Sequence, residues 1–229
     1  FMECHIEQGR RLFDAGEAVA AVTCITGIYR EIITIQGDAN HAGTTLPIHR
    51  RDALAGAAEV VLAVEHIMQE PAMEGLTATV GHLEVQPNAS NIIPGEVLLT
   101  LDLRTAQPAK RQLALEKLTA AIDGIQNRRG IRIDRRLDLD QPEMPLDEDL
   151  ITALEDSMAA NGHPCRRLVS MAGHDAANMA RLTKSAMLFV QSIDGRSHCP
   201  QEDTNGLEIA QAAQVLLDAV LLLDRRLSL

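Results

Sequence analysis

The sequence predicts an α/β domain that is interrupted by a smaller inserted α+β domain. Two observations lead to this prediction. Apolar strands alternate with helices in the two outer segments of the chain, residues 1–28 and 142–229. Between them, residues 29–141 have the pattern strand, helix, strand, strand, helix, strand, which is the order of a split β-α-β fold. We therefore expect one domain built from both outer segments, with a complete small domain between them.

The first segment opens with an apolar strand, followed by a short helix that Gly16 closes and by a β-branched strand; the ranges are 1–6, 10–15 and 19–26. In the inserted domain, strands are expected at 29–36, 77–85, 95–104 and 131–139. A helix over 50–70 has apolar residues at intervals of three and four and stops at Pro71, and a second helix runs from Pro108 to Gly130. In the strand over 95–104 apolar and polar residues alternate, so Arg104 is expected on an open face.

The last segment resumes the α/β pattern after a linker with a proline on each side, residues 141–145. Helices are expected at 147–161, 175–182 and 204–225, and strands at 166–170 and 185–192. The buried stripe of the long last helix is expected at Ile209, Ala213, Leu216, Leu217 and Val220.

The composition argues against nucleic acid and membranes as partners. With 21 basic and 32 acidic residues the net charge is −11, which repels both nucleic acid and anionic lipid. The chain has no Trp and one Tyr, so it lacks stacking platforms for bases. Its most apolar run, 215–223, is too short to span a bilayer, and four scattered cysteines suit a reducing compartment. We expect a cytoplasmic protein. Because the chain opens inside a strand pattern, we also expect that a further portion precedes Phe1.

The segment His5-Ile6-Glu7-Gln8-Gly9 places an imidazole at the end of the first strand, where α/β folds bind ligands and metals. His198 follows another strand of the same domain and is the natural partner for His5 in a metal site. Glu7 and Glu202 could supply a carboxylate ligand or base. The alternatives are a structural role for His5 and a nucleophilic Cys199 with His198 as its base; no G-x-S-x-G motif supports a serine nucleophile.

Two further groups of polar residues lie in predicted loops, where function usually collects. One is the pair His174-Asp175, which follows the strand at 166–170. The other belongs to the inserted domain and comprises His41, Asn88 or Asn91, and Arg104. A guanidinium on an open sheet face suits a carboxylate, although a surface arginine without a function is equally compatible with the pattern.

Seven motifs in order resemble the M20-type amidohydrolases, in the branch of the allantoate amidohydrolases and N-carbamoyl-L-amino-acid hydrolases. They are HIEQG at 5–9, NHAG at 40–43, RDA at 51–53, PNASNIIPG at 87–95, LDLR at 101–104, AGHDA at 172–176 and SHCPQE at 197–202. The resemblance spans essentially the whole chain and covers only the later part of such an enzyme. It departs from the family pattern modestly, at Cys4, Met171, Arg196 and Cys199.

The resemblance implies a two-metal catalytic domain interrupted by a lid domain that forms a homodimer. His5 and His198 would each bind one of two divalent metal ions, Zn or Mn, and the other metal ligands and the general base would lie upstream of Phe1. His41, Asn91 and Arg104 match the lid residues that bind substrate. In the family this His reaches across the dimer to the scissile carbonyl, while the Arg and Asn hold the substrate carboxylate. Gln8 matches a residue that contacts the ureido group.

For His174 and Asp175 the resemblance leaves two roles open, namely direct substrate contact and fixing of the loops beside the metal. The implied activity is hydrolysis of a small ureido compound by the full-length enzyme, with residues 1–229 inactive alone. We also expect this chain to bind divalent metal poorly, because one ligand for each metal is too few. The alternatives are an aminoacylase or dipeptidase of the same superfamily and a dimerisation module without catalytic activity.

Overall fold

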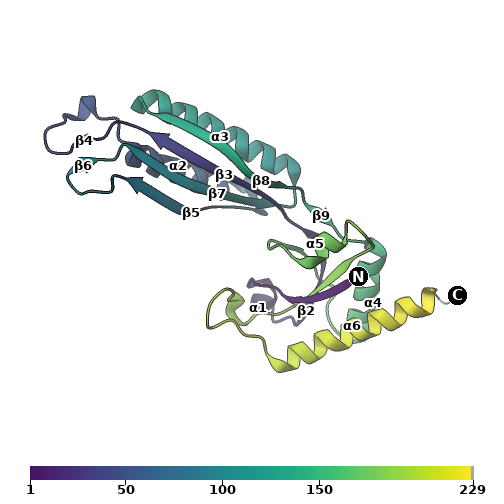
Figure 1. Ribbon diagram of the computed structural model, residues 1–229. Coiled ribbons are helices and arrows are strands. Elements are labelled where there is room, and N and C mark those ends of the chain that lie inside the picture. The colour runs from purple at the N-terminus through teal and green to yellow at the C-terminus, as the bar shows by residue number, and fades with distance from the viewer. Residues whose placement is uncertain (228–229) are drawn as a thin grey trace. The chain divides into compact units, whose positions relative to one another are not determined.

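The computed structural model describes residues 1–227 and divides the chain into two units (Figure 1). Unit 1 comprises Phe1–Thr26 together with the chain from Met144 onward, and unit 2 comprises Gly27–Glu143. The two junctions lie close to the boundaries after residues 28 and 141 that the sequence suggests. Each unit has its own cluster of buried apolar residues.

Unit 2 is a four-stranded antiparallel sheet with two long helices packed against it (Figure 1). The strand order is β5-β7-β3-β8, with β3 at Gly27–Gln36, β5 at Leu76–Gln86, β7 at Glu96–Thr105 and β8 at Arg132–Gln141. The helices are α2 (Ala53–Gln69) and α3 (Pro108–Arg129). Asp52 caps α2 by accepting a hydrogen bond from the backbone N–H of Ala55, and the left-handed Gly130 (φ 61°) ends α3. The expected order of strands and helices is therefore confirmed.

The alternation along β7 separates a covered face from an open one. Val97, Leu99, Leu101 and Leu103 are buried under the helices, whereas the residues between them are half-buried. Arg104 belongs to the second set, as the pattern predicts. Beyond the far end of the sheet, the short strands β4 (Asn40–His41) and β6 (Ile92–Ile93) pair with each other, which the sequence did not indicate.

Unit 1 contains a five-stranded mixed sheet in the order β1-β11-β2-β10, with β9 also paired to β2. The strands are β1 (Met2–Ile6), β2 (Val19–Ile25), β9 (Met144–Pro145), β10 (Arg167–Ser170) and β11 (Ala186–Val190). β1 and β11 are parallel, so their carboxyl ends lie at the same edge of the sheet. The helices of this unit are α1 (Arg11–Ala15), α4 (Glu148–Ala160), α5 (Asp175–Met179) and α6 (Gly206–Leu227). Three short 3-10 helices complete the described elements: η1 (Pro47–His49), η2 (Pro71–Met73) and η3 (Ile193–Gly195).

Most of the predicted stripe of α6 is wrong, although Leu216 is partly buried and packs against the core of unit 1. The helix buries Ala212, Val215 and Ala219, while Ile209, Leu217 and Val220 are about half exposed. Several large apolar side chains of α6 therefore face away from the packing surface, to which Ala212, Val215 and Ala219 contribute. By length and composition, Gly206–Arg226 is also the one candidate membrane span among residues 1–227; a single such helix is weak evidence for one.

Candidate functional site

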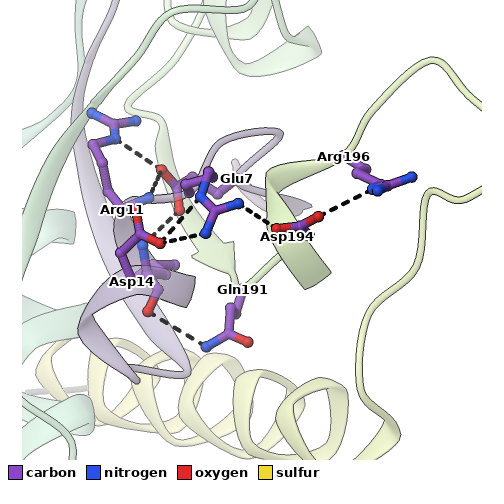
Figure 2. A network of polar contacts seen from close by, with 8 residues as sticks. Glu7, Arg11, Asp14, Gln191, Asp194 and Arg196 are labelled. Atoms are coloured by element: carbon purple, nitrogen blue, oxygen red, sulfur yellow. Dashed lines mark hydrogen bonds and ion pairs between the residues drawn. The ribbon is translucent and has the colours of Figure 1, made fainter.

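Glu7, the acidic residue next to the end of β1, is held by the start of α1 (Figure 2). Its side chain is fully buried. One oxygen, Oε1, accepts hydrogen bonds from the backbone N–H and Nε of Arg11 at 3.1 and 2.8 Å, and the other accepts from the backbone N–H of Leu12 at 2.8 Å. The carboxylate thus satisfies backbone donors that the first turn of a helix leaves unpaired. The expectation that Glu7 serves as a metal ligand or base is not supported by this geometry.

The loops that follow β1 and β11 meet at Gln8. Its backbone N–H donates to Ser192 Oγ at 3.0 Å, and its side-chain Nε2 donates to Ser197 Oγ at 2.9 Å. Gln8 adopts a left-handed conformation (φ 57°), which few residues other than glycine adopt and which is often found at functional sites. The expected convergence of these two strand-end loops is therefore present.

Contacts between charged groups and close packing also join these loops. Asp194 forms ion pairs with Arg10 and with Arg196, and Figure 2 shows Asp194 between Arg196 and the segment that carries Glu7. Gly195 is left-handed (φ 65°), and a Cβ there would lie 2.8 Å from the backbone nitrogen of Arg10. Only glycine allows this close approach.

His198 lies in the second of these loops, and Glu202 fixes its position. Glu202 Oε2 accepts hydrogen bonds from Ser197 Oγ at 2.8 Å and from the backbone N–H of His198 at 3.1 Å. These hydrogen bonds lower the pKa of Glu202, and the charges of His198 and His5 act in the same direction. His198 itself is left-handed (φ 58°). Glu202 thus organises the His198 loop and lies within electrostatic reach of both histidines.

His5 is grouped with two residues that the sequence did not assign to it. Glu3, His5 and His174 each offer a ligand atom, and these three atoms lie within 4.8 Å of one another. The rings of His5 and His174 pack edge to face with centroids 4.5 Å apart. His174 Nδ1 is 3.8 Å from Glu3 Oε1. Within residues 1–227, the potential metal ligands gathered around His5 are therefore Glu3 and His174 and do not include the expected His198.

His174 reaches this position because the segment after β10 crosses to β1. The backbone N–H of Ala176, in the first turn of α5, donates to Glu3 Oε2 at 2.7 Å. The His174 side chain is 1% exposed, and burial together with the charge of His5 lowers the pKa of His174 to about 4, although Asp175 opposes the shift. The signal for Glu3 was present in the sequence, since Glu3 and His5 are two residues apart on a strand and share a face.

In unit 2, His41 and Asn91 lie together. The backbone N–H of Ala42 donates to the Asn91 carbonyl at 2.9 Å, and His41 pairs with Ile92 across β4 and β6. His41 Nδ1 accepts hydrogen bonds from the backbone N–H groups of Gly43 at 3.0 Å and Thr44 at 3.2 Å. Nδ1 is therefore unprotonated, and in the neutral ring the proton is on Nε2, which makes Nε2 a donor.

Arg104 lies at the opposite end of the same sheet. It pairs with Ile28 at the start of β3, whereas His41 and Asn91 follow the strand ends at Gln36 and Gln86. At about 3.3 Å per residue, the eight steps from Ile28 to Gln36 span roughly 26 Å. The structure thus brings His41 and Asn91 together and separates both from Arg104.

Asp102 holds Arg104 on the open sheet face. Arg104 Nε donates to Asp102 Oδ1 at 2.7 Å, and Arg30 Nε donates to Asp102 Oδ2 at 2.7 Å. Burial raises the pKa of Asp102, but the hydrogen bonds and charges of the two arginines outweigh it and bring the pKa below its ordinary value. Asp102 is a residue that sequence reasoning did not single out. Its signal is its place two residues from Arg104 on one strand.

A comparison with known protein families identifies the family of this chain. The model of peptidase family M20/M25/M40 matches residues 1–222. The chain belongs to this family. It is 34% identical to the allantoate amidohydrolase of Bacillus subtilis over 220 residues, which cover 95% of this chain and 53% of the relative. It is also 34% identical to the N-carbamoyl-L-amino-acid amidohydrolase of Paenarthrobacter aurescens over 226 residues, which cover 98% of this chain and 54% of the relative.

Solved structures agree with this placement. A hydantoinase/carbamoylase family amidase from Burkholderia multivorans superposes with a TM-score of 0.88 at 34% identity, over 95% of this chain and 53% of that one. AtUAH in complex with glyoxylate superposes with a TM-score of 0.87 at 30% identity, over 96% of this chain and 52% of that one. The chain therefore has the M20 fold of the allantoate amidohydrolase and N-carbamoyl-L-amino-acid amidohydrolase branch, and it spans about half the length of the curated relatives it matches.

Proposed function

We propose that the full-length protein containing this chain is a metal-dependent amidohydrolase that cleaves a C–N bond of a small ureido compound, allantoate or an N-carbamoyl-L-amino acid. The observation that carries the proposal is the group formed by Glu3 and His5 of β1 together with His174. It occurs in a chain that is about one-third identical to enzymes named for those substrates. Unit 1 would be the catalytic part and unit 2 the lid.

The side chains present suit the divalent metals that the family uses. His5 would hold one ion and His198 the other, since imidazole nitrogen is a preferred ligand for zinc. Their bound water would have a pKa near neutrality, which supplies hydroxide for hydrolysis. Gln8 lies between these positions, because its side chain is hydrogen-bonded to Ser197 beside His198. It would contact the ureido group of the substrate.

His41 would bind the carbonyl oxygen of the ureido group. Because Nδ1 accepts two backbone hydrogen bonds, the ring is fixed with Nε2 as a donor. Negative charge grows on the carbonyl oxygen during attack, and a fixed donor stabilises that charge in the transition state. The loss of one such donor typically costs roughly 3 kcal/mol of transition-state stabilisation.

Arg104 and Asn91 would hold the substrate carboxylate. A guanidinium binds a carboxylate through two parallel hydrogen bonds, and the Asp102 contact keeps the Arg104 fork in place. AtUAH, which superposes on this chain, binds glyoxylate, a small carboxylate. One substrate of this size cannot span the distance between Arg104 and Asn91 of a single chain. The proposed site therefore takes Arg104 from one chain and His41 with Asn91 from a second copy, so that the lid units form a homodimer.

Hydrolysis measurements on the full-length protein test this proposal. We expect release of ammonia from allantoate or from an N-carbamoyl-L-amino acid in the presence of Mn²⁺ or Zn²⁺. Arg104→Ala should raise KM strongly. The control is Arg136→Ala, which should leave KM unchanged, because Arg136 is an exposed arginine of β8 that pairs with Ile32 of β3. Undiminished turnover of Arg104→Ala at low substrate would rule out the carboxylate role.

The two other candidate functions predict different results. Activity on peptide bonds and none on ureido groups would favour an aminoacylase or dipeptidase; the tripeptidase from Staphylococcus aureus, at 19% identity, shows only that the fold is shared. Failure of the full-length protein to hydrolyse any of these substrates would favour a dimerisation module. A cytoplasmic location stays a prediction, which fractionation of cells would test.

A further inference from the structure

We infer that Arg50 is a positioning residue that holds the ring of His41 in its donor orientation. It does so by closing the His41 turn, by which we mean residues 41–45. The inference rests on the proposed function, in which His41 binds the carbonyl oxygen of the substrate, and it adds the residue that keeps His41 ready for that role.

The orientation of the His41 ring depends on the backbone of its own turn. The hydroxyl and the backbone N–H of Thr45 donate to the His41 carbonyl at 2.8 and 3.1 Å. The backbone thereby folds back on itself, and the N–H groups of Gly43 and Thr44 donate to Nδ1 of the ring. A Cβ at Gly43 would lie 3.2 Å from Cε1 of His41, which shows how closely the ring lies against the turn. If the turn opens, Nδ1 loses both donors and the ring is free to rotate.

Arg50 joins the two ends of this turn. Its Nε donates to the Thr45 carbonyl at 3.0 Å, and its Nη2 donates to the Ala42 carbonyl at 2.5 Å. A guanidinium is planar and its N–H groups point in fixed directions, so the Arg50 side chain sets the separation of the two carbonyls. A lysine has one ammonium group on a flexible stem and cannot fix two carbonyls in the same way. Arg50 thus restrains the His41 turn at both ends.

Apolar packing contributes little to this loop. Between Thr45 and Arg50, the apolar residues Leu46 and Ile48 are 62% and 85% exposed. The turn begins in β4, a strand of two exposed residues. Local hydrogen bonds therefore determine whether the turn stays closed, and Arg50 supplies two of them.

Arg51 provides a matched control, because it is the next residue and has a different partner. Its guanidinium forms an ion pair with Asp38 at 3.5 Å, and its side chain is 59% exposed. Arg50 is also exposed, but its hydrogen bonds go to backbone carbonyls of the His41 turn. Removal of either arginine changes the net charge by the same amount. A difference between the two variants therefore measures the contacts to the turn.

Steady-state kinetics of the full-length protein test the role of Arg50 in catalysis. Arg50→Ala should lower kcat for the ureido substrate by about tenfold and leave KM within about twofold, because a loosely held donor mainly weakens binding of the transition state. Arg51→Ala should change kcat less than about twofold. Arg50→Lys keeps the charge but should stay within about threefold of Arg50→Ala.

A double variant separates positioning from a general structural role. When Arg50→Ala is added to His41→Ala, kcat should not fall further, because a positioning residue acts only through the ring that it holds. A residue that merely stabilised the loop or the unit would lower kcat in both backgrounds.

Hydrogen exchange in this 229-residue chain tests the same contact without catalysis. Amide exchange of Gly43 and Thr44, followed by NMR, should be about tenfold faster in Arg50→Ala than in the parent chain and in Arg51→Ala. The free energy of unfolding should be the same in the two variants, which separates local opening of the turn from a general loss of stability.

Four results would overturn the inference. They are equal kcat in Arg50→Ala and Arg51→Ala, full activity of Arg50→Lys, a further loss of kcat in the double variant, and unchanged amide exchange at Gly43 and Thr44. Failure of the parent protein to hydrolyse any ureido compound would count against the proposed function. The exchange measurement would then still decide whether Arg50 holds the His41 ring.

Discussion

The two units of the chain arrange their polar residues in opposite ways. In unit 1, residues from distant segments come together: Glu3 and His5 of β1 lie against His174, and Gln8 is bonded to Ser197. In unit 2, the candidate substrate-binding residues separate into two groups at opposite ends of one sheet. Unit 1 therefore gathers its candidate residues within one unit, whereas unit 2 cannot place both of its groups on one small ligand.

This difference separates two kinds of dependence. Metal binding at His5, if it occurs, would depend on how unit 1 folds. In the proposed function, substrate binding would depend on two copies of unit 2, because a small molecule would have to meet Arg104 from one sheet end and His41 from the other. Variants of each unit can test the two dependences separately.

The largest expected effect is restoration of activity by two defective variants. In the full-length protein, His41→Ala and Arg104→Ala should each reduce kcat/KM by about a hundredfold or more. If one site takes the two residues from different copies, a mixed dimer has one site with both defects and one site with neither. An equal mixture of subunits should then regain about one quarter of the normal activity. The measurement is the hydrolysis rate after the two variants are unfolded and refolded together.

The control for this experiment is His41→Ala mixed with a second variant of the same sheet end, Asn91→Ala. Each site of the mixed dimer then contains one of the two defects, so no activity returns. If the mixture of His41→Ala and Arg104→Ala subunits regained no activity, the proposed need for two copies of unit 2 would be wrong. Each complete site would then lie within one chain.

The second prediction concerns stability and compares two helix starts. Glu7→Ala should lower the free energy of unfolding of unit 1 by about 2–3 kcal/mol, because it leaves the buried N–H of Leu12 without an acceptor and removes one of the partners of Arg11. In unit 2, Asp52→Ala removes one contact to Ala55 and should cost about 1 kcal/mol. Denaturant unfolding of the two variants measures both effects. Equal effects would show that burial of Glu7 adds nothing to its capping role.

Much of the fold follows from the sequence because its signals are local. Pro108 and Gly130 mark the ends of α3, and strict alternation assigns the two faces of β7. The stripe of α6 could not be predicted in the same way, since hydrophobic residues occur around most of the helix. There the buried face is decided by how closely the helix approaches the sheet, which favours Ala212 and Ala219 over the larger leucines.

The site was harder to predict than the fold, because its geometry depends on contacts between distant segments. Motif order pointed to His5, but pairing it with His198 rested on adjacent strand ends. The structure places His174 beside His5, through the crossing of the segment after β10, and the pairing of His5 with His198 in a metal site stays a prediction. Glu7 was considered as a ligand because it is acidic and near His5, while its actual partners are backbone N–H groups of α1 that no residue pattern reveals.

The smallest expected effect is a change in the titration of Asp102, and it tests whether Arg104 is held in place within one unit. Two arginines keep the pKa of Asp102 below its ordinary value despite burial. Arg104→Ala removes one of them and should raise the pKa of Asp102, as measured by NMR titration of the side-chain carboxyl carbon. Arg136→Ala should leave it unchanged.

The change in pKa has a consequence for stability with a defined sign. A carboxyl whose pKa is depressed by folding stabilises the folded chain above the pKa of the unfolded state, about 4, and this contribution is lost as the pH falls through the lower folded value. In Arg104→Ala the pKa of Asp102 moves back toward or above the unfolded value, so the decrease in stability between about pH 5 and pH 2 should be smaller than in the parent chain. An unchanged pH dependence would mean that Arg30 alone sets the charge of Asp102. Arg104 would then lack the fixed orientation that distinguishes it from a mobile surface arginine.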